Sequence, residues 1–181
     1  MPLLEARNLV KNFGARRVVD GVCFSVEPGE IVGLLGRNGA GKTTSFRMAI
    51  GMLEADEGEV HFEDRDVTKQ PMHRRARFGM GYLAQEPSIF RGMTVLENLL
   101  AVLELHEPTT DQRKNKAREL IERFGLRHKA EDLAETCSGG ERRRLEIARA
   151  MACKPRLLLL DEPFAAVDPH TVEELQSEVR R

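Results

Sequence analysis

Residues 36–44 read Gly36-Arg37-Asn38-Gly39-Ala40-Gly41-Lys42-Thr43-Thr44. The stretch satisfies the pattern GxxxxGK[ST], follows an apolar run at 31–35 that predicts a strand, and precedes a helix-compatible segment. Glycines let successive backbone N–H groups turn inward at a helix N-terminus, where the helix dipole favours an anion. A chance match to the four fixed positions is roughly a 1% event in a chain of this length. The stretch therefore predicts a phosphate cradle between a buried strand and a helix.

Two side chains of this turn carry specific chemistry. Lys42 adds a mobile positive charge for the β and γ phosphates, and Thr43 offers a hydroxyl to Mg²⁺, which keeps several waters and takes few protein ligands. The residues predicted to contact the nucleotide phosphates are Gly36, Arg37, Asn38, Gly39, Ala40, Gly41, Lys42, Thr43 and Thr44.

An acidic pair follows a second apolar run, residues 157–160, which is typical of a buried parallel strand. Ligands of open α/β sheets bind at the carboxyl ends of the strands, where Asp161 and Glu162 stand. Asp161 is placed to hold Mg²⁺ through its water shell, and Glu162 to orient or deprotonate an attacking water. The alternative is a solvated acidic turn after a core strand. We predict that Lys42 and the acidic pair meet around one triphosphate.

Composition narrows the class of protein. The chain has 181 residues, enough for one domain. Its 28 Lys and Arg are balanced by 29 Asp and Glu, so it has no overall positive charge to attract nucleic acid. Its apolar stretches are far shorter than the about 20 residues of a membrane-spanning helix. Glu5 interrupts any signal-peptide core, and the three cysteines lack CxxC spacing. These features predict a cytosolic chain without membrane insertion.

Turn and capping signals divide the chain further. A strand at 22–26 and a Pro-Gly turn precede the run at 31–35, whereas Thr94 and Thr109 each open a capping box and hence a helix. The second helix carries one apolar stripe and ends at Gly125, and its stripe consists of Ala117, Leu120, Ile121 and Phe124. A helical lobe over about 87–150 is therefore predicted between strand-rich segments.

Residues 137–141, Cys137-Ser138-Gly139-Gly140-Glu141, resemble the signature motif of ABC ATPases, in which the first residue is usually Leu. The resemblance implies an α/β P-loop fold with a mostly parallel core sheet, an antiparallel β subdomain and an inserted helical subdomain. It implies Mg²⁺ and ATP as cofactors, and a head-to-tail dimer in which Ser138, Gly139 and Gly140 of one copy cover the γ-phosphate of the other. The alternative is that Ser138 is an ordinary helix N-cap.

The resemblance assigns further roles position by position. Gln85 is similar to the glutamine that senses the metal and the attacking water, and Phe13 to the aromatic residue that stacks on adenine. Asp168 resembles a dimer-contact residue, and Phe90 and Arg91 would line the groove for the membrane subunits. Alternatively, Gln85 is an ordinary polar loop residue, Phe13 is a buried core residue, and Asp168 caps a helix. Phe90 would then cover the core of the helical lobe, and Arg91 would be solvated.

Several stretches, among them 79–83, 85–91 and 141–150, resemble the ATPase subunit of lipopolysaccharide export. The resemblance implies transmembrane permease partners and a peripheral position on the cytoplasmic face of the inner membrane. The rivals are a branched-chain amino acid importer ATPase and a nucleotide-binding module without catalysis. The short distance from Gly36 to Ser138 leaves no room for the coiled-coil arms of DNA-repair relatives. We interpret Arg142, Arg143 and Arg144 as a solvated helix face rather than a nucleic-acid site.

After Glu162 only one helix is expected, over about 169–181, whereas family members continue to another core strand and a switch histidine. We therefore expect a single domain over 1–181 that is C-terminally truncated. Such a domain should bind nucleotide but turn it over poorly.

Overall fold

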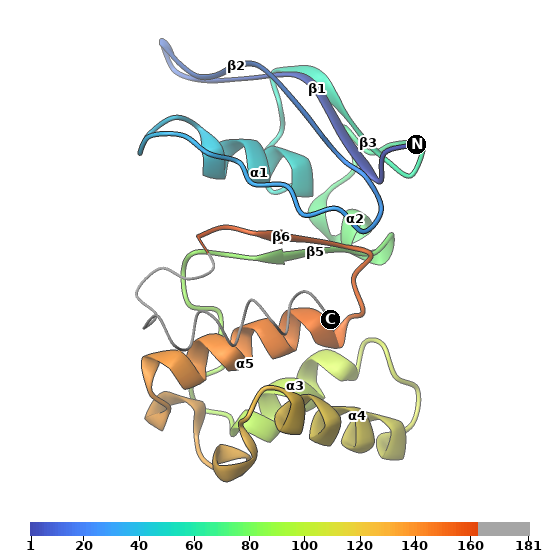
Figure 1. Cartoon of the computed structure of the whole chain (residues 1–181), viewed down its shortest axis with the longest axis vertical. Helices are drawn as coiled ribbons and strands as arrows, with labels where there is room; N and C mark the ends of the chain where they lie inside the picture. Colours follow the sequence, from blue (N-terminus) through green and yellow to red (C-terminus); the bar gives the residue numbers. More distant parts are fainter. Residues whose placement is uncertain (163–181) are drawn as a thin grey trace. The chain divides into compact units, whose positions relative to one another are not determined.

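The computed structural model describes residues 1–162 of the chain. These residues form two compact units, one of residues 1–80 and one that begins at residue 81. The first unit contains an antiparallel sheet and two α-helices, and the second contains a short sheet and three α-helices (Figure 1). The chain thus has the predicted α/β composition, and the helix predicted after Glu162 lies outside the described residues.

A four-stranded sheet forms the first unit, in the order β2-β1-β3-β4. Its strands are β1 (Leu4–Phe13), β2 (Arg16–Val26), β3 (Glu57–Phe62) and β4 (Arg65–Asp66), and every pairing is antiparallel. Leu4 and Ala6 on β1 lie opposite Phe62 and Val60 on β3, and all four side chains are buried. Alternate residues of each strand thereby fill one face, as period-two patterning requires. The predicted antiparallel β subdomain is confirmed.

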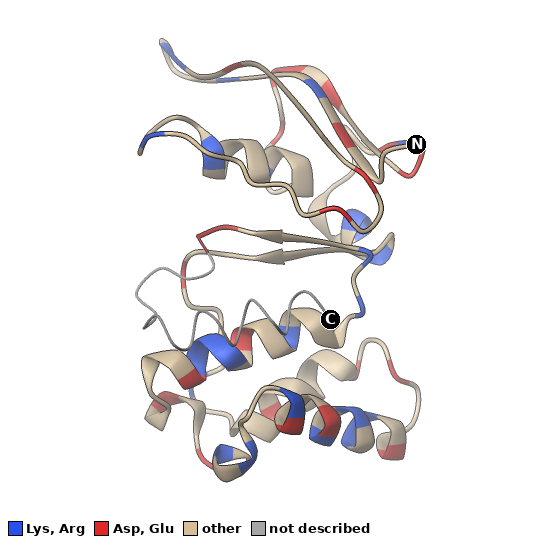
Figure 2. Ribbon diagram, viewed as in Figure 1, with Lys and Arg blue, Asp and Glu red and all other residues tan. Residues whose placement is uncertain are grey.

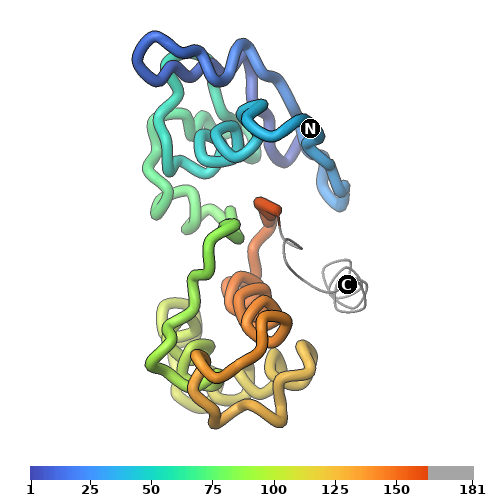
Figure 3. The backbone as a smooth tube through the Cα atoms, turned by 90° about the vertical axis from the view of Figure 1, so that its left-hand side faces the viewer, coloured from blue at the N-terminus to red at the C-terminus, as the bar shows by residue number. Residues whose placement is uncertain are grey.

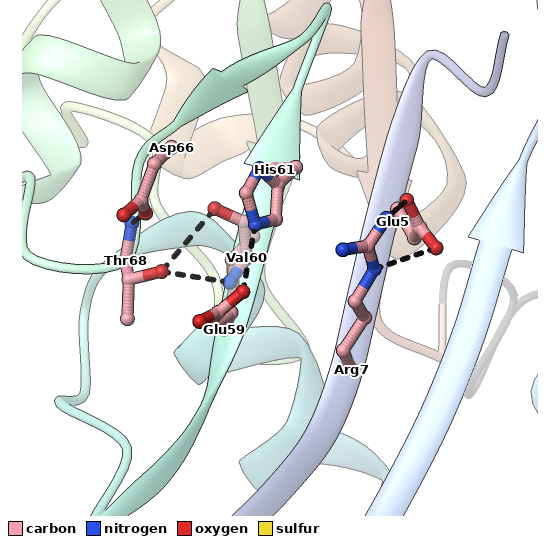
Figure 4. Close-up of polar contacts among 7 residues, drawn as sticks. All are labelled: Glu5, Arg7, Glu59, Val60, His61, Asp66 and Thr68. Atoms are coloured by element: carbon pink, nitrogen blue, oxygen red, sulfur yellow. Dashed lines mark hydrogen bonds and ion pairs between the residues drawn. The ribbon is translucent and has the colours of Figure 1, made fainter.

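Two sets of polar contacts lie on this sheet, one around Thr68 beside β3 and β4 and one within β1 (Figure 4). Thr68 accepts a hydrogen bond from the Val60 N–H at 2.9 Å, and its own N–H donates to the Asp66 carboxylate at 2.9 Å. On β1, the Arg7 guanidinium donates two hydrogen bonds to Glu5, at 2.8 and 2.7 Å. The latter pair is exposed and contributes little to stability.

The run at 31–35 is not a strand, and this corrects the sequence prediction. The turn before it forms as expected, with the Glu30 N–H donating to the Glu27 carbonyl at 3.1 Å and Gly29 at φ 77°. However, residues 31–35 belong to neither described sheet, and Ile31 and Leu35 are 73% and 93% exposed. An apolar run of this kind needs strand partners on both edges and cover on both faces. Neither of the two sheets described provides them.

Helix α1 (Lys42–Ile50) packs on the sheet through Met48, Ala49 and Ile50, and its C-terminus is fastened by Arg75 of α2 (Met72–Arg77). The Arg75 side chain is only 2% exposed. Its guanidinium donates to the Met48 and Ala49 carbonyls at 2.8 and 2.6 Å, and also to the carbonyls of Gln70 and Thr68. A cation at a helix C-terminus also interacts favourably with the helix dipole. Arg75 therefore links the end of α1 to α2.

In the second unit, β5 (Met80–Leu83) lies beside β6 (Leu157–Leu160), and both arrows point the same way (Figure 1). The connection between them contains α3 (Val95–Leu103), α4 (Thr110–Arg123) and α5 (Gly139–Ala152), which pack against one another (Figures 1 and 3). Two short 3₁₀ turns, Arg127–Lys129 and Ala134–Thr136, lie between α4 and α5. The helices share a continuous buried core that includes Leu99, Leu120 and Leu145.

The helix ends agree with the sequence predictions. Thr94, Thr109 and Ser138 each cap a helix through a complete capping box. Gly125 adopts φ 64° after α4, its N–H donates to the Glu122 carbonyl, and the Leu126 N–H donates to Ile121 at 2.8 Å. This pair of bonds is the Schellman arrangement, in which glycine supplies the left-handed residue.

Candidate functional site

The glycine-rich turn leads directly into α1. The Ala40 N–H donates to the Arg37 carbonyl at 3.1 Å, and α1 begins at Lys42, immediately after Gly41. The Lys42 ammonium donates to the carbonyls of Gly36 and Arg37, at 2.8 and 3.1 Å. The ammonium therefore lies against the turn whose N–H groups would receive phosphate oxygens. Chemically, the turn offers a helix N-terminus and a cation to the same anion.

Gly41 is required by its surroundings as well as by its φ of 87°. A Cβ atom at Gly41 would lie 2.7 Å from the Val18 carbonyl oxygen and 3.0 Å from Val19 Cγ2. Strand β2 thus packs directly against the start of α1, and this contact positions the turn relative to the sheet.

Gly41→Ala should therefore destabilise the fold by about 2–3 kcal/mol, since left-handed strain adds to a clash with backbone. Gly14→Ala is the matched control, because Gly14 also has a positive φ, of 59°, but nothing lies within 4 Å of its Cβ position. Urea unfolding of both variants would measure the difference. Equal losses in the two variants would mean that the contact with Val18 contributes nothing.

The acidic pair stands at the end of β6. The Asp161 side chain is 3% exposed, the Tyr82 hydroxyl lies 3.2 Å from its Oδ2, and its N–H donates to the Leu83 carbonyl. Glu162 is exposed and adopts φ 46°, a left-handed conformation that is uncommon for a residue with a side chain. The Gln85 amide donates to Glu162 Oε2 at 2.8 Å. The structure therefore brings together Gln85 and Glu162, which are 77 residues apart.

Sequence reasoning missed the buried ion pair behind these residues. Arg143 and Glu146 on α5 are in contact at 2.7 Å, with side chains only 8% and 4% exposed. Arg143 also donates to the carbonyls of Ala84 and Glu162, at 3.2 and 3.4 Å. The Glu146 carboxylate accepts the Ser88 N–H at 3.0 Å. Arg143 thus fixes the segments that follow β5 and β6, and their spacing in turn positions Gln85 beside Glu162.

The predicted solvated face at 142–144 is consequently wrong for Arg143. Arg142 is exposed, as expected, but successive helix residues point about 100° apart, so Arg143 faces the unit interior. The sequence did contain a signal for this ion pair, because Arg143 and Glu146 carry opposite charges three residues apart on one helix. Lys and Arg as well as Asp and Glu occur along both α4 and α5 (Figure 2).

Ser138 caps α5, and Glu141 completes the cap. The Glu141 N–H donates to Ser138 Oγ at 3.2 Å, and Glu141 Oε2 accepts the Ser138 N–H at 2.7 Å. Its other oxygen, Oε1, pairs with His128 at 2.9 Å. The hydrogen bond from the Ser138 backbone, followed by the contact with His128, lowers the pKa of Glu141 to about 2. The capping interpretation of Ser138 is thus correct, and a role of Ser138, Gly139 and Gly140 toward a second copy stays a prediction.

This pKa makes the start of α5 acid-sensitive. A lowered carboxylate pKa contributes stability above its ordinary value of 4.5, and that contribution is lost as pH falls toward about 2. Between pH 7 and pH 3 the parent should lose about 2 kcal/mol that Glu141→Gln does not lose. Urea unfolding at the two pH values would measure it, with the exposed Glu135→Gln as control. The same pH dependence in parent and Glu141→Gln would contradict the assignment.

The remaining predicted residues are exposed. Phe13 ends β1 with 52% of its side chain exposed, so the alternative of a buried Phe is wrong. Phe90 is 45% exposed, and the Arg149 guanidinium lies 4.4 Å from its ring centroid. Both the N–H and the carbonyl of Phe90 are bonded to the Asn98 amide at 2.9 Å, which fixes the backbone here. Arg91 is exposed, and Asp168 lies outside the described residues.

The candidate metal ligands suit Mg²⁺ by their chemistry. Thr43, Gln85 and Asp161 offer a hydroxyl, an amide oxygen and a carboxylate, all of which are hard oxygen ligands. Among residues 1–162, no group of three or more His, Cys, Asp and Glu side chains could hold a metal ion.

Comparison with known families decides the class of the chain. The family model described as ABC transporter matches residues 19–165, which include the glycine turn, Gln85, Ser138 and the acidic pair. The chain belongs to the ABC transporter ATP-binding family. No helix in the described part is long and apolar enough to cross a membrane.

Relatives of this family match nearly the whole chain. An uncharacterized ABC transporter ATP-binding protein of Rhizobium meliloti is 54% identical over 98% of this chain and 66% of its own length. The lipopolysaccharide export system ATP-binding protein LptB of Haemophilus influenzae is 52% identical, and that of Escherichia coli K12 is 50% identical. Both alignments cover 97% of this chain and 73% of LptB. The chain thus spans about two thirds to three quarters of these relatives.

Solved structures of the family have the same fold. The ATP-binding cassette MJ1267 of an ABC transporter matches with a TM-score of 0.90 and 33% identity, over 99% of this chain and 76% of that one. Its ADP conformation matches with a TM-score of 0.86 and 31% identity over the same shares. The P-loop fold of the ABC type is therefore confirmed.

Proposed function

We propose that this chain binds Mg·ATP and hydrolyses it as the ATPase subunit of an ABC transporter that exports lipopolysaccharide. The observation that carries the proposal is the joint presence of the glycine turn and the Gln85–Glu162 pair in a chain 50–52% identical to LptB. The glycine turn accounts for phosphate binding, and the Gln85–Glu162 pair accounts for activation of a water molecule.

The residues would divide the reaction among them. Lys42 and the N–H groups of the turn would stabilise charge on the β and γ phosphates, in a transition state where positioning and electrostatics do most of the work. Thr43, Asp161 and Gln85 would hold Mg²⁺, which neutralises charge on the phosphate oxygens when bound. Glu162 Oε1 would accept a proton from the attacking water, while Oε2 stays on the Gln85 amide. Phe13 would stack on the adenine.

Partners follow from the same reasoning. Ser138, Gly139 and Gly140 would act on the nucleotide of a second copy, with Asp168 at the contact between copies. Phe90 and Arg91 would meet the transmembrane permease subunits on the cytoplasmic face of the inner membrane. The exposed ring of Phe90 on a backbone held by Asn98 supports an interface role, because the ring is presented to solvent on a fixed loop.

Two measurements test the proposal. The purified chain should bind ATP, and Lys42→Ala should weaken binding at least about tenfold, as expected for loss of a charged hydrogen bond to phosphate. Lys116→Ala is the control, because Lys116 pairs with Glu119 on the exposed face of α4. The chain should co-purify with the membrane subunits of lipopolysaccharide export. Co-purification with amino acid importer subunits instead would favour the importer alternative.

A further inference from the structure

The tip of β1 extends past its last partner on β3. The β1–β3 ladder ends where Val10 lies opposite Glu57, yet β1 continues to Phe13. Lys11, Asn12 and Phe13 therefore have β2 on one side only. Phe13, the residue expected to stack on adenine, is the last residue of this extension.

Asp56 takes the place of the missing strand. Its carboxylate accepts the Asn12 N–H at 2.7 Å and the Asn12 side-chain amide at 3.1 Å, and Lys11 Nζ lies 2.6 Å from its Oδ1. The Asp56 N–H donates to the Val10 carbonyl at 2.9 Å. Lys11 is only 14% exposed and also donates to the Glu54 carbonyl at 2.7 Å. The hydrogen bond from Lys11 lowers the pKa of Asp56, so the carboxylate is charged at neutral pH.

The same hairpin also contacts the glycine turn. Lys11 on β1 lies opposite Val19 on β2, and Val18 and Val19 are the residues that Gly41 approaches closely. The hairpin is thus held from both sides, by Gly41 at the start of α1 and by Asp56, five residues beyond Gly51 at its end. These contacts determine where Phe13 stands relative to the phosphate-binding turn.

We propose that Asp56 is a positioning residue for the nucleotide base: through Lys11 and Asn12 it holds Phe13 at the place where an adenine on the glycine turn can stack. Asp56 itself touches neither base nor phosphate in this scheme. The proposal rests on the proposed function, and specifically on ATP binding with Phe13 at the base.

A comparison of ATP with inorganic tripolyphosphate tests this role, because tripolyphosphate has the phosphates and lacks the base. Isothermal titration calorimetry with Mg²⁺ would give both affinities for the parent, Asp56→Asn and Phe13→Ala. Base–aromatic stacking contributes about 1–3 kcal/mol, so each variant should weaken ATP binding about fivefold or more. Tripolyphosphate binding should stay within about twofold of the parent, because the contact of Gly41 with β2 is intact.

The double variant Phe13→Ala/Asp56→Asn separates positioning from general destabilisation. If Asp56 acts through Phe13, the double variant should bind ATP no more weakly than Phe13→Ala alone. Glu5→Gln is the matched control, since Glu5 is also a charge-paired carboxylate of the same sheet but lies at the other end of β1 (Figure 4). It should bind both ligands like the parent. Should Asp56→Asn fail to fold, Lys11→Met removes the same ion pair and gives the same comparison.

The remaining outcomes overturn the proposal. If Asp56→Asn weakens ATP and tripolyphosphate binding equally, Asp56 supports the whole site rather than Phe13. If Asp56→Asn leaves ATP binding unchanged, Phe13 does not depend on Asp56 for its position. A full additional loss in the double variant would show that Asp56 acts independently of Phe13. A parent that binds tripolyphosphate but shows no preference for ATP refutes this inference alone. A parent that binds neither ligand refutes the proposed function as well.

Discussion

Glu162→Gln is expected to lower the steady-state ATPase rate by a factor of about 100 or more while leaving ATP affinity nearly unchanged. The amide has the size of the carboxylate but cannot accept a proton from the attacking water. In the structure Glu162 is exposed and bonded at Oε2 by Gln85, and its left-handed backbone turns it away from the strand direction of β6. An exposed side chain held in this way contributes little to packing, and we expect its role to be in the reaction.

The measurement is phosphate release by residues 1–181 at saturating Mg·ATP, together with calorimetric ATP binding. Glu86→Gln serves as the control, because Glu86 is an exposed carboxylate next to Gln85 and is given no role. A Glu162→Gln variant that turns over ATP at the parent rate would remove Glu162 from the mechanism. Loss of ATP binding in that variant would instead show that Glu162 supports the nucleotide in the ground state.

Local rules explain which elements the sequence could predict. A capping box at Thr94, Thr109 or Ser138 depends on residues within one turn, and the Schellman end at Gly125 depends on one glycine. Such signals are independent of the rest of the fold. The glycine turn is only partly of this kind, because Gly41 has a positive φ but also lies close to Val18 and Val19 of β2.

The failures involve partners distant in sequence. The run at 31–35 has the composition of a central strand, but composition alone does not supply strands on either edge. Arg143 and Arg75 are buried, which is rare for arginine, and the carbonyls that make this possible come from Ala84, Glu162, Met48 and Ala49. Only the fold brings these groups together. The predicted set of site residues stays a prediction, whereas the burial of Arg75 and Arg143 could not be predicted from the sequence.

Arg75→Met should be the most destabilising single substitution in the first unit, at about 3 kcal/mol or more. Methionine keeps much of the aliphatic packing but donates no hydrogen bond, so the carbonyls of Met48, Ala49, Gln70 and Thr68 lose a charged donor. Burial lowers the pKa of Arg75 to about 10, which leaves the guanidinium charged at neutral pH. The carbonyls thus bond to a cation in the native protein.

Urea unfolding followed by circular dichroism would measure the loss, with Arg74→Met as control. Arg74 is the exposed neighbour on α2, bonded only weakly to Gln70 at 3.4 Å, and its replacement should change stability by less than about 0.5 kcal/mol. Arg75→Lys should recover only part of the loss, because one ammonium cannot reach four carbonyls that a planar guanidinium spans. If Arg75→Met and Arg74→Met unfold at the same urea concentration, the link between α1 and α2 does not stabilise the unit. Since α1 carries Lys42 at its other end, a stable Arg75→Met protein with weakened ATP binding would show that this link also orders the glycine turn.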